Sequence, residues 1–435
     1  MRFEDLAGRA VVVWGAGREG IAALAELTGR GIEATVAVTG SGTLPEGVPG
    51  ASGEDGLAAL LAADVVVKSP GIPKTSEEFR RLDAAGVRLT SLSDLWLGAN
   101  HARVIGVTGT KGKSTTSAVT THVLAALGWQ SRLVGNVGTA VTGLLGEGQV
   151  AVMEVSSYQA SSLTVSPRVA VVTSLFPEHL PWHGGFEAYR DDKFNLLAHG
   201  PELVVVSDLQ PELRERAALV APGAQLLTPA ELGLQVTSQS ITWQGVGELG
   251  ADELQLRGHH NVGNAALALA AAKAWCGDDF DAVAALASLR EVQPLEHRLQ
   301  VVPSNDGRTW VDDSLATNPQ AVEAALRTWP DSPVVLILGG SERDLPFEPL
   351  IDFLAHRQAP TKVLTIGPAG HRFADEAAGR IRGLVKAENF ADAMHLARTS
   401  DLTRAVVLLS PCAPSFDEFT DYRDRSRAFR EAALT

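Results

Sequence analysis

The feature that most constrains this chain is a glycine-rich turn between an apolar run and a helical pattern, in the stretch VIGVTGTKGKSTT at residues 104–116. The apolar residues at 104, 105 and 107 predict a buried strand, and those at 119, 123, 124 and 127 predict a helix. A strand, a glycine-rich loop, Lys-Ser and a helix form the arrangement that cradles phosphate groups. Glycines let backbone N–H groups approach the phosphates, and the helix N-terminus supplies positive potential.

The loop offers seven candidate residues for binding nucleotide phosphates. Lys113 would reach the β- and γ-phosphates, and Ser114 would bind Mg²⁺. The strict spacing G-x-x-x-x-G-K-[ST] is not met, because position 107 is Val. Lysine is scarce, at 8 of 435 residues, so two lysines here favour phosphate binding over an ordinary glycine-rich turn. Lys111 could contact phosphate or only solvate the loop. The seven residues are Gly109, Thr110, Lys111, Gly112, Lys113, Ser114 and Thr115.

Length and composition narrow the class of protein. The 435 residues predict two to four domains, and 45% hydrophobic with 20% charged residues is typical of a globular enzyme. The net charge of −14 argues against a nucleic-acid binder. The two cysteines, Cys276 and Cys412, make neither a disulfide framework nor a zinc pattern. Since no signal-peptide core or membrane-span run is found, we expect a cytoplasmic protein without membrane insertion.

A second glycine-rich turn follows the first buried run of the chain. Residues 15–20 read GAGREG between an apolar strand pattern and a helical pattern, which fits a dinucleotide fingerprint. That fingerprint wants an acidic residue at the end of the second strand, but the chain reads Val38-Thr39-Gly40 there, and Glu33 lies at the wrong end. We therefore expect a Rossmann-like turn that holds another phosphate, such as that of a nucleotide-linked substrate. A nicotinamide-dependent oxidoreductase is the alternative from a different class.

Several polar residues after the loop suit a metal or nucleotide site. Glu154 ends a buried strand, where a carboxylate is a typical Mg²⁺ partner; we favour this role over the alternative of a satisfied capping glutamate. Asn261 and Asn264 open a helix, which they could cap, or they could face a nucleotide. Taken alone, Lys193 would be a solvated helix lysine and His179 a plain loop histidine. Near the C-terminus, a helix that starts at Ser415 could hold a carboxylate, or Ser415 could simply cap it with Glu418 as its capping-box partner.

These patterns predict an α/β protein of three domains. We expect a Rossmann-like domain at 1–97 and a central P-loop-type domain with a mostly parallel sheet at 98–298. A second Rossmann-like domain should follow at 299–435.

Eight motifs, taken in order, resemble the ATP-dependent Mur ligases of peptidoglycan precursor synthesis and span nearly the whole chain. Further segments are similar to the branch that joins glutamate to UDP-N-acetylmuramoyl-L-alanine, namely SPGIP at 69–73, SSYQ at 156–159 and LSPCAPSFDEF at 409–419. The eight motifs are GTKGKST at 109–115, EVSS at 154–157, EHL at 178–180, Tyr189 with Lys193, HN at 260–261 with Asn264, EHR at 296–298, DS with ATNP at 313–319, and LGG at 338–340.

The resemblance implies a role for each domain, in the order UDP-substrate, ATP and glutamate. ATP would phosphorylate the alanyl carboxylate to an acyl phosphate, which the glutamate amine would attack. Two Mg²⁺ ions and a CO₂-derived carbamate on Lys193 are the implied cofactors. The resemblance further implies that the partners are small-molecule substrates, that no nucleic acid is bound, and that the protein is a monomer.

The resemblance also assigns residues to roles. It makes Lys113, His179 and Lys193 catalytic, and Ser114, Glu154, His179 and Lys193 metal ligands. The ATP contacts it implies are the loop residues with Asn261, Asn264, Arg298 and Asp313. The implied substrate contacts are Arg18, Glu19, Gly71, Asn136, Thr317, Arg343, Ser415 and Tyr422.

Departures from the family pattern lie near the substrates, at Leu315, Pro181, Arg343 and the strand end Val38-Thr39. They leave the amino acid open: D-glutamate is favoured, and L-glutamate or the amino acid of a sister ligase is the alternative. A nucleotide switch without catalysis is a further alternative.

Overall fold

The computed structural model describes residues 1–435 apart from 41, 137–140, 257, 259 and 343–344. The chain forms two compact units. Unit 1 comprises Met1–Leu254 and His260–Val292, and unit 2 comprises Gln255–His259 and Gln293–Thr435. Among the described residues, no helix combines the length and the apolar character that crossing a membrane requires.

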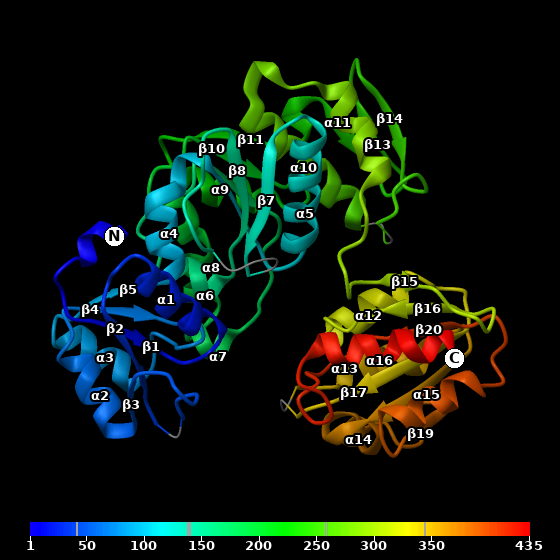
Figure 1. The fold of residues 1–435 in the computed structure, drawn as a ribbon. Helices are drawn as coiled ribbons and strands as arrows, with labels where there is room; N and C mark the ends of the chain where they lie inside the picture. The colour runs from blue at the N-terminus through cyan, green and yellow to red at the C-terminus, as the bar shows by residue number, and fades with distance from the viewer. Residues whose placement is uncertain (41, 137–140, 257, 259, 343–344) are drawn as a thin grey trace. The chain divides into compact units, whose positions relative to one another are not determined.

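The first sheet of unit 1 has five parallel strands in the order β3-β2-β1-β4-β5 (Figure 1). Its first strand is buried throughout because helices cover both faces. Val11 and Val13 pack with α1 and α4, whereas Val12 and Trp14 pack with α2 and α3. The elements are β1 (Val11–Trp14), α1 (Arg18–Gly29), β2 (Ala34–Val38), β3 (Gly50–Ser52), α2 (Gly53–Leu61), β4 (Val65–Lys68), α3 (Glu77–Ala84), β5 (Arg88–Thr90) and α4 (Leu92–Asn100).

The second sheet of unit 1 has six parallel strands in the order β11-β10-β9-β6-β8-β7, and the phosphate loop joins β6 to α5. The predicted mostly parallel sheet is therefore confirmed. An antiparallel sheet of β12, β13 and β14 follows it. The elements are β6 (Val104–Thr108), α5 (Lys113–Ala126), β7 (Gln130–Gly135), β8 (Gln149–Glu154), α6 (Ser157–Ala160), β9 (Val169–Val172), α7 (Leu180–His183), α8 (Phe186–Phe194), β10 (Leu203–Val206), α9 (Pro211–Val220), β11 (Gln225–Leu227), β12 (Leu234–Val236), β13 (Ser240–Trp243), β14 (Gly247–Gly250), α10 (His260–Cys276) and α11 (Ala282–Ser288).

Unit 2 holds a six-stranded sheet in the order β15-β16-β20-β17-β18-β19, in which only the β15–β16 pair is antiparallel among the described strands. Helices flank this sheet as well (Figure 1). The elements are β15 (Gln300–Val302), β16 (Thr309–Asp312), α12 (Pro319–Arg327), β17 (Val334–Gly339), α13 (Glu348–His356), β18 (Thr361–Ile366), α14 (Gly367–Glu376), β19 (Leu384–Lys386), α15 (Phe390–Arg398), β20 (Val406–Leu409) and α16 (Tyr422–Leu434).

The last helix begins later than the sequence predicts. The Asp421 side chain caps α16 by accepting hydrogen bonds from the N–H groups of Arg423 (2.7 Å) and Asp424 (3.1 Å). The prediction of a helix starting at Ser415 is therefore wrong, because an aspartate six residues further on satisfies the free N–H groups. The Glu418 carboxylate, expected to complete a box with Ser415, accepts instead from the Phe390 N–H at 3.0 Å.

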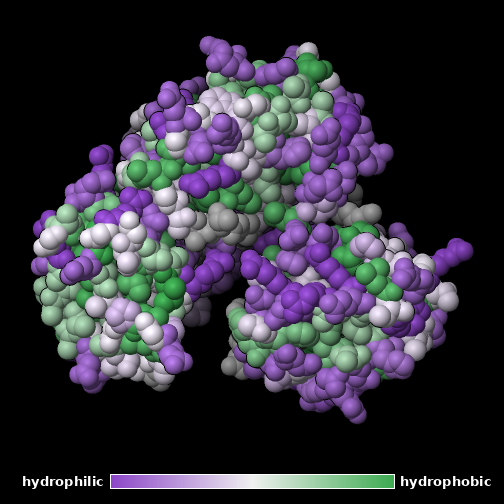
Figure 2. All heavy atoms as spheres, viewed as in Figure 1, coloured by the Kyte–Doolittle hydropathy of each residue, from purple (hydrophilic) through white to green (hydrophobic). Residues whose placement is uncertain are grey.

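Helix α16 is amphipathic. Its buried side, which includes Phe429 and Ala433, packs against the sheet, and Phe429 lies 5.1 Å from the ring of Trp310. Figure 2 shows hydrophilic residues in purple over the outer side of this helix. The helix is thus held by one apolar face, as is typical of a surface helix.

We predict that Gly20→Ala lowers the free energy of unfolding by about 1–3 kcal/mol, because an added Cβ would force the backbone to shift. That Cβ would lie 1.9 Å from the carbonyl oxygen of Gly15, in the turn between β1 and α1. Urea unfolding followed by circular dichroism measures the change. Gly29→Ala, in the same helix, meets nothing within 4 Å and should stabilise by roughly 0.5 kcal/mol. Equal midpoints for the two variants would contradict the close approach at Gly20.

Candidate nucleotide and metal site

The phosphate loop requires glycine at two positions. Gly109 has φ +144° and Gly112 has φ +86°, a region that side chains rarely adopt. An added Cβ would lie 1.9 Å from Thr173 Oγ1 at residue 109 and 2.4 Å from Asn264 Oδ1 at residue 112. Because glycine has no Cβ, the loop can pass close to Thr173, just after β9, and to α10 before α5 begins at Lys113. The N-terminus of α5 therefore faces the loop, where an anion is stabilised.

The two loop lysines have different partners. Lys113 Nζ donates hydrogen bonds to the carbonyl oxygens of Gly109 (2.8 Å) and Thr110 (3.0 Å), so its charge lies over the loop. Lys111 Nζ forms a half-exposed ion pair with Glu178 Oε1 at 2.8 Å. Burial disfavours the Glu178 charge, but Lys111 outweighs it and holds the pKa of Glu178 below its usual value. Lys111 is therefore paired with a carboxylate of the 178–180 motif.

Lys193 lies under the same loop. Its side chain is 1% exposed, and its Nζ donates to the Gly109 carbonyl oxygen at 2.8 Å. Tyr189, one turn earlier on α8, hydrogen-bonds through its hydroxyl to Thr110 Oγ1 at 2.7 Å. Burial and then the charge of Lys113 lower the pKa of Lys193 well below its ordinary value. The solvated lysine that the helix pattern alone suggests is wrong, because α8 turns this residue toward the loop.

Glu154 has an oxygen that suits a cation. It ends β8, beside the loop-bearing β6, and it is 1% exposed. Its Oε1 accepts from Asn136 Nδ2 at 2.7 Å, while its buried Oε2 has no hydrogen-bond partner within the described part of the chain. A buried carboxylate oxygen left in this way is costly unless a cation or a donor reaches it. The interpretation of Glu154 as a satisfied capping residue therefore accounts for Oε1 but not for Oε2.

The other candidate metal ligands lie on two separate elements. Ser114 is buried in the first turn of α5, and His179 precedes α7 with φ 54°. Burial lowers the pKa of His179, which favours the neutral imidazole that binds metals. Across the described residues, no three His, Cys, Asp or Glu side chains group as a complete metal cage. These residues fit Mg²⁺, which protein sites usually hold through one or two carboxylates plus substrate phosphates and water.

The asparagine pair of α10 lies beside the phosphate loop. Asn264 Nδ2 donates to Asn261 Oδ1 at 3.0 Å, and Asn264 Oδ1 is the atom that an added Cβ at Gly112 would meet. Both amides lie near the N-terminus of α10, next to the start of α5. The geometry brings together the loop and the two asparagines, as the nucleotide interpretation expects.

The predicted UDP-side residues line the contact between the first and second sheets of unit 1. Arg18 Nη2 donates to the Asn136 carbonyl oxygen at 3.4 Å, and Glu19 Oε1 accepts from Gln159 Nε2 at 3.0 Å. Burial raises the pKa of Glu19. The Gly71 carbonyl oxygen accepts from Trp182 Nε1 at 3.1 Å.

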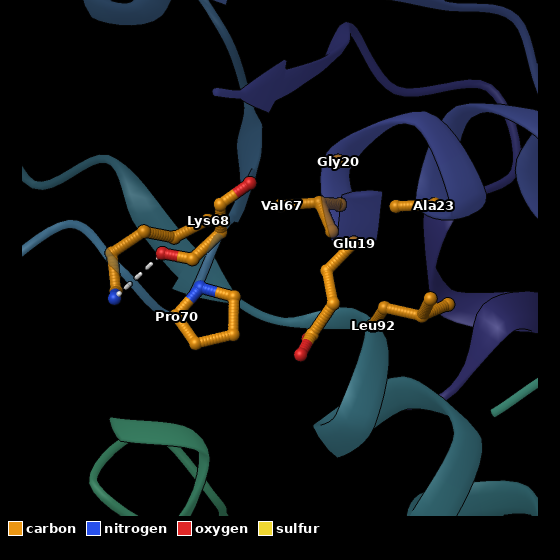
Figure 3. A pocket seen from close by; sticks show the side chains of 8 residues that line it. Glu19, Gly20, Ala23, Val67, Lys68, Pro70 and Leu92 are labelled. Carbon is orange, nitrogen blue, oxygen red and sulfur yellow. Dashed lines mark hydrogen bonds between the residues drawn. The ribbon is translucent and has the colours of Figure 1, made fainter. Parts of the chain in front are cut away.

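A small pocket next to these residues contains a buried lysine that the sequence analysis missed. Lys68 ends β4, and its ammonium donates to the carbonyl oxygens of Ser69 (3.2 Å) and Ile72 (2.8 Å), the first of which Figure 3 shows. Burial lowers the pKa of Lys68 to about 8. The pocket leaves no room for a water-sized sphere, far short of the roughly 300 Å³ at which ligand pockets begin. The lining residues are Glu19, Gly20, Ala23, Val67, Lys68, Ser69, Pro70 and Leu92.

Unit 2 gathers its predicted residues near the carboxyl ends of β16 and β20. Asp313 is buried, and it accepts from Ser410 Oγ (2.8 Å) and from the Leu299 N–H (3.3 Å). Burial raises its pKa to about 7, against the opposing charge of Arg298. Thr317 lies two residues before α12. Ser415 is 2% exposed, and Tyr422 packs its ring 5.3 Å from His297. Arg343 lies outside the described residues.

A buried polar network behind these residues was not predicted. Arg425 is 1% exposed and donates to the carbonyl oxygens of Ser314 (3.0 Å) and Ala413 (3.2 Å). Burial lowers its pKa to about 10. His297 Nδ1 lies 2.9 Å from Asp312 Oδ2. In the sequence Arg425 is one of several helix arginines, and only the fold shows that it points inward.

Together the parallel sheet, the glycine-rich loop with Lys113, and the buried Lys193 beneath it define a nucleotide-binding α/β protein. The patterns described as "Mur ligase middle domain" and "Mur ligase, glutamate ligase domain" match residues 107–272 and 297–412. A UDP-N-acetylmuramoyl-L-alanine–L-glutamate ligase of Micromonospora sp. is 40% identical over 99% of this chain and 98% of that relative. The chain belongs to the Mur ligase family, and the expectation of a Mur-type ligase is confirmed.

Two further comparisons broaden this assignment. A UDP-N-acetylmuramoylalanine–D-glutamate ligase of Rubrobacter xylanophilus is 36% identical over 98% of each chain. A crystal structure of UDP-N-acetylmuramate–alanine ligase from Thermotoga maritima matches with a TM-score of 0.59 at 18% identity, over 97% of this chain and 98% of that one. The second match supports the α/β fold.

We predict that Asp313→Asn raises the free energy of unfolding at pH 8 by an amount on the order of 4 kcal/mol. The folded-state pKa of about 7 lies above the ordinary 3.8, so the folded state keeps a proton that the unfolded state loses in that interval. Stability of the unsubstituted protein is therefore lost as the pH rises from about 4 to 7, and asparagine removes this dependence. Urea unfolding without nucleotide at pH 4 to 8 measures it. A difference between the two proteins that stays constant with pH would contradict the raised pKa.

Proposed function

We propose that this protein uses ATP to join glutamate to the L-alanyl carboxylate of UDP-N-acetylmuramoyl-L-alanine. The observation that carries the proposal is the convergence of Lys113 and Lys193 on the Gly109 carbonyl oxygen, near Glu154, whose Oε2 has no hydrogen-bond partner among the described residues. The Lys113 cation and a buried carboxylate oxygen without a partner among the described residues, both at a phosphate loop, suit transfer of a phosphoryl group in the presence of Mg²⁺. Full-length similarity to glutamate-adding relatives supports the choice of substrates.

L-Glutamate is the amino acid that we propose. The motifs by themselves favour D-glutamate, but the Micromonospora relative, at 40% identity, carries an L-glutamate name. The relative with the D-glutamate name is 36% identical. Because the two identities are close, the stereochemistry is the point on which the proposed function most needs an experiment.

The chain's own residues would act at two stages. In the first, an oxygen of the alanyl carboxylate attacks the γ-phosphorus, the bond to ADP breaks, and Lys113 stabilises the charge on the transferred phosphoryl oxygens. In the second, the glutamate amine, after losing a proton, attacks the acyl carbon, and inorganic phosphate leaves. Glu154 Oε2 and the Ser114 hydroxyl would hold Mg²⁺, which supplies charge neutralisation at the phosphates. The loop N–H groups and the α5 N-terminus would orient the β- and γ-phosphates.

We further propose that Lys193 carries a CO₂-derived carbamate. An amine with a lowered pKa is neutral for more of the time and can attack CO₂, and burial protects the product. The carbamate would replace a buried cation by an anion that offers oxygen to Mg²⁺. It would also remove the repulsion between Lys193 and Lys113, two positive charges that contact the same carbonyl oxygen.

The remaining assignments follow the order of the sheets. We propose UDP-substrate binding by 1–97 with Arg18, Glu19, Gly71 and Asn136, and ATP binding by 98–298. Glutamate binding falls to 299–435, through Thr317, Arg343, Ser415 and Tyr422, and Arg298 with Asp313 would contact ATP. We also propose that the protein is a monomer and acts in the cytoplasm.

The pure protein should release ADP when it is given UDP-N-acetylmuramoyl-L-alanine, ATP, Mg²⁺ and L-glutamate. D-Glutamate should support turnover at least about tenfold more weakly, since a site that orients an amine discriminates through its geometry. Lys113→Ala should lower turnover to a few per cent or less, because no neighbour replaces its charge on the phosphates. Lys273→Ala, in the last turn of α10, is the matched control. ADP release with neither enantiomer would refute the function, and a preference for D-glutamate would refute the stereochemistry alone.

We expect Lys193→Ala to be inactive and to regain part of its turnover in millimolar acetate or formate, because a small carboxylate can occupy the space of a carbamate. Turnover of the unsubstituted protein should fall in CO₂-depleted buffer and return with bicarbonate. Lys193→Arg keeps the cation and should show no rescue. The carbamate is contradicted if small carboxylates do not restore turnover of Lys193→Ala and if bicarbonate does not change turnover of the unsubstituted protein.

A further inference from the structure

A chain of polar contacts links the loop after β4 to the segment after Glu154. Lys74 Nζ lies 3.1 Å from Asp192 Oδ1, and Asp192 Oδ2 lies 2.7 Å from His183 Nδ1. His183 Nε2 lies 3.1 Å from Ser157 Oγ. Four side chains, from the loop after β4 and from helices α6, α7 and α8, are thus hydrogen-bonded in series. Neither the motifs nor the comparisons assign a role to them.

The order Asp192–His183–Ser157 resembles a nucleophilic triad, but the geometry excludes that use. Ser157 is 4% exposed and the His183 side chain is fully buried, so no substrate could reach the hydroxyl. Asp192 also carries a second partner, Lys74, which a triad aspartate does not need. Both ring nitrogens of His183 are engaged, which fixes the ring in one orientation. The contacts are therefore those of a structural support with one correct arrangement.

The network ends beside two residues of the candidate site. Asp192 immediately precedes Lys193 on α8, and Ser157 begins α6, three residues after Glu154. A shift of the Asp192 carboxylate would therefore move the backbone that carries Lys193. A shift of Ser157 would likewise move the end of β8, which carries Glu154. His183 joins these two segments across a single ring.

The other end of the network lies on a predicted substrate loop. Lys74 follows Gly71 by three residues, and its ammonium also donates to the Ser161 carbonyl oxygen just after α6. Trp182 Nε1 donates to the Gly71 carbonyl oxygen, and the ring of Trp182 packs 4.4 Å from that of Tyr158 in α6. Two neighbouring residues of α7 therefore connect these segments. Trp182 contacts Gly71 and Tyr158, and His183 contacts Asp192 and Ser157.

A second contact joins α6 to the other turn of the first sheet. Gln159 Nε2 donates to Glu19 Oε1 at 3.0 Å, while Gln159 Oε1 accepts from the Ser156 N–H at 3.0 Å in a capping box. The glycine-rich turn at 15–20 and the loop at 69–76 therefore both attach to the one-turn helix α6. Because α6 directly follows Glu154, these attachments define the distance between the UDP-side turns and the site.

We propose that Lys74 and His183 are positioning residues that hold α6 and α8 in register with the 69–76 loop, so that Glu154 and Lys193 are aligned with the UDP-linked substrate. This inference rests on the proposed function. Reactions between two bound groups depend steeply on alignment, and a displacement of about 1 Å can cost about 100-fold in rate. In the described part of the chain neither residue forms a hydrogen bond or ion pair with the phosphate loop, so KM for ATP should change less than KM for the UDP-linked substrate.

The test compares Lys74→Met, Lys74→Arg and a control in steady-state turnover. Lys74→Met should lower kcat by about tenfold or more and raise KM for the UDP-linked substrate, with KM for ATP within about twofold of the original. Lys74→Arg, which keeps the ion pair with Asp192, should recover most of the turnover. Arg214→Met removes an exposed ion pair between Arg214 and Glu231 and should leave both constants unchanged. Equal falls in kcat for Lys74→Met and Arg214→Met would overturn the proposal.

A double-mutant cycle tests the connection between the two residues. Because Lys74 and His183 both act through Asp192, Lys74→Met combined with His183→Phe should lose clearly less kcat than the product of the two single losses. If His183→Phe does not fold, His183→Asn, which can keep one of the two hydrogen bonds, replaces it in the cycle. Fully multiplicative losses would mean independent effects and would reject the shared network.

Hydrogen exchange separates this inference from the function on which it rests. In the free protein, Lys74→Met should increase amide exchange in α6 and α8 and leave α5 unchanged, whatever reaction the protein catalyses. Unchanged exchange in α8 would refute the network. If the unsubstituted protein fails to release ADP while exchange in α8 rises as expected, the proposed function fails and the structural support remains.

Discussion

The parallel pairing of β6 with β8 and β9 is the constraint on which the candidate site depends. Parallel strands end at a common edge, so the pairing brings the loop after β6, Glu154 at the end of β8 and Thr173 after β9 to one place. Thr173 then limits the loop to glycine at 109, and that glycine's carbonyl oxygen accepts from Lys113 and Lys193. A change in strand order would separate all of these groups.

Buried charges are the second theme of this site. Lys193 is buried, donates to one backbone carbonyl oxygen and lies near the charge of Lys113, and Glu154 keeps one oxygen without a partner in the described chain. Such groups are unfavourable in the free protein, because charge is poorly stabilised away from water. Anionic phosphates and a divalent cation would supply the missing partners. The free protein thus carries an arrangement of charges that bound substrates complete, which is how preorganised sites stabilise transition states.

Local sequence was enough to predict those parts of the site that are formed by residues close together in the chain. The glycine spacing, Lys113 and Ser114 form one continuous segment, and the buried runs before it and after it predict the strands on either side. The asparagines of α10 and Glu154 were found because each marks the end of a regular element. The helix start at Ser415 was wrong because two cap residues, Ser415 and Asp421, compete, and propensity does not decide between them.

The sequence by itself therefore determined the α/β class, the phosphate loop and the family, since these rest on periodicity and on motifs read within short segments. Only the tertiary structure decided which charged side chains are buried and what they touch. Lys74 and Asp192 are 118 residues apart in the chain, and Arg425 and Ser314 are 111 apart. Their contacts depend on how sheets and helices pack, and the helix pattern of residues 186–194 does not reveal that Lys193 turns inward. The physical reason is that burial and pairing are properties of the whole fold, whereas propensity and capping act over a few residues.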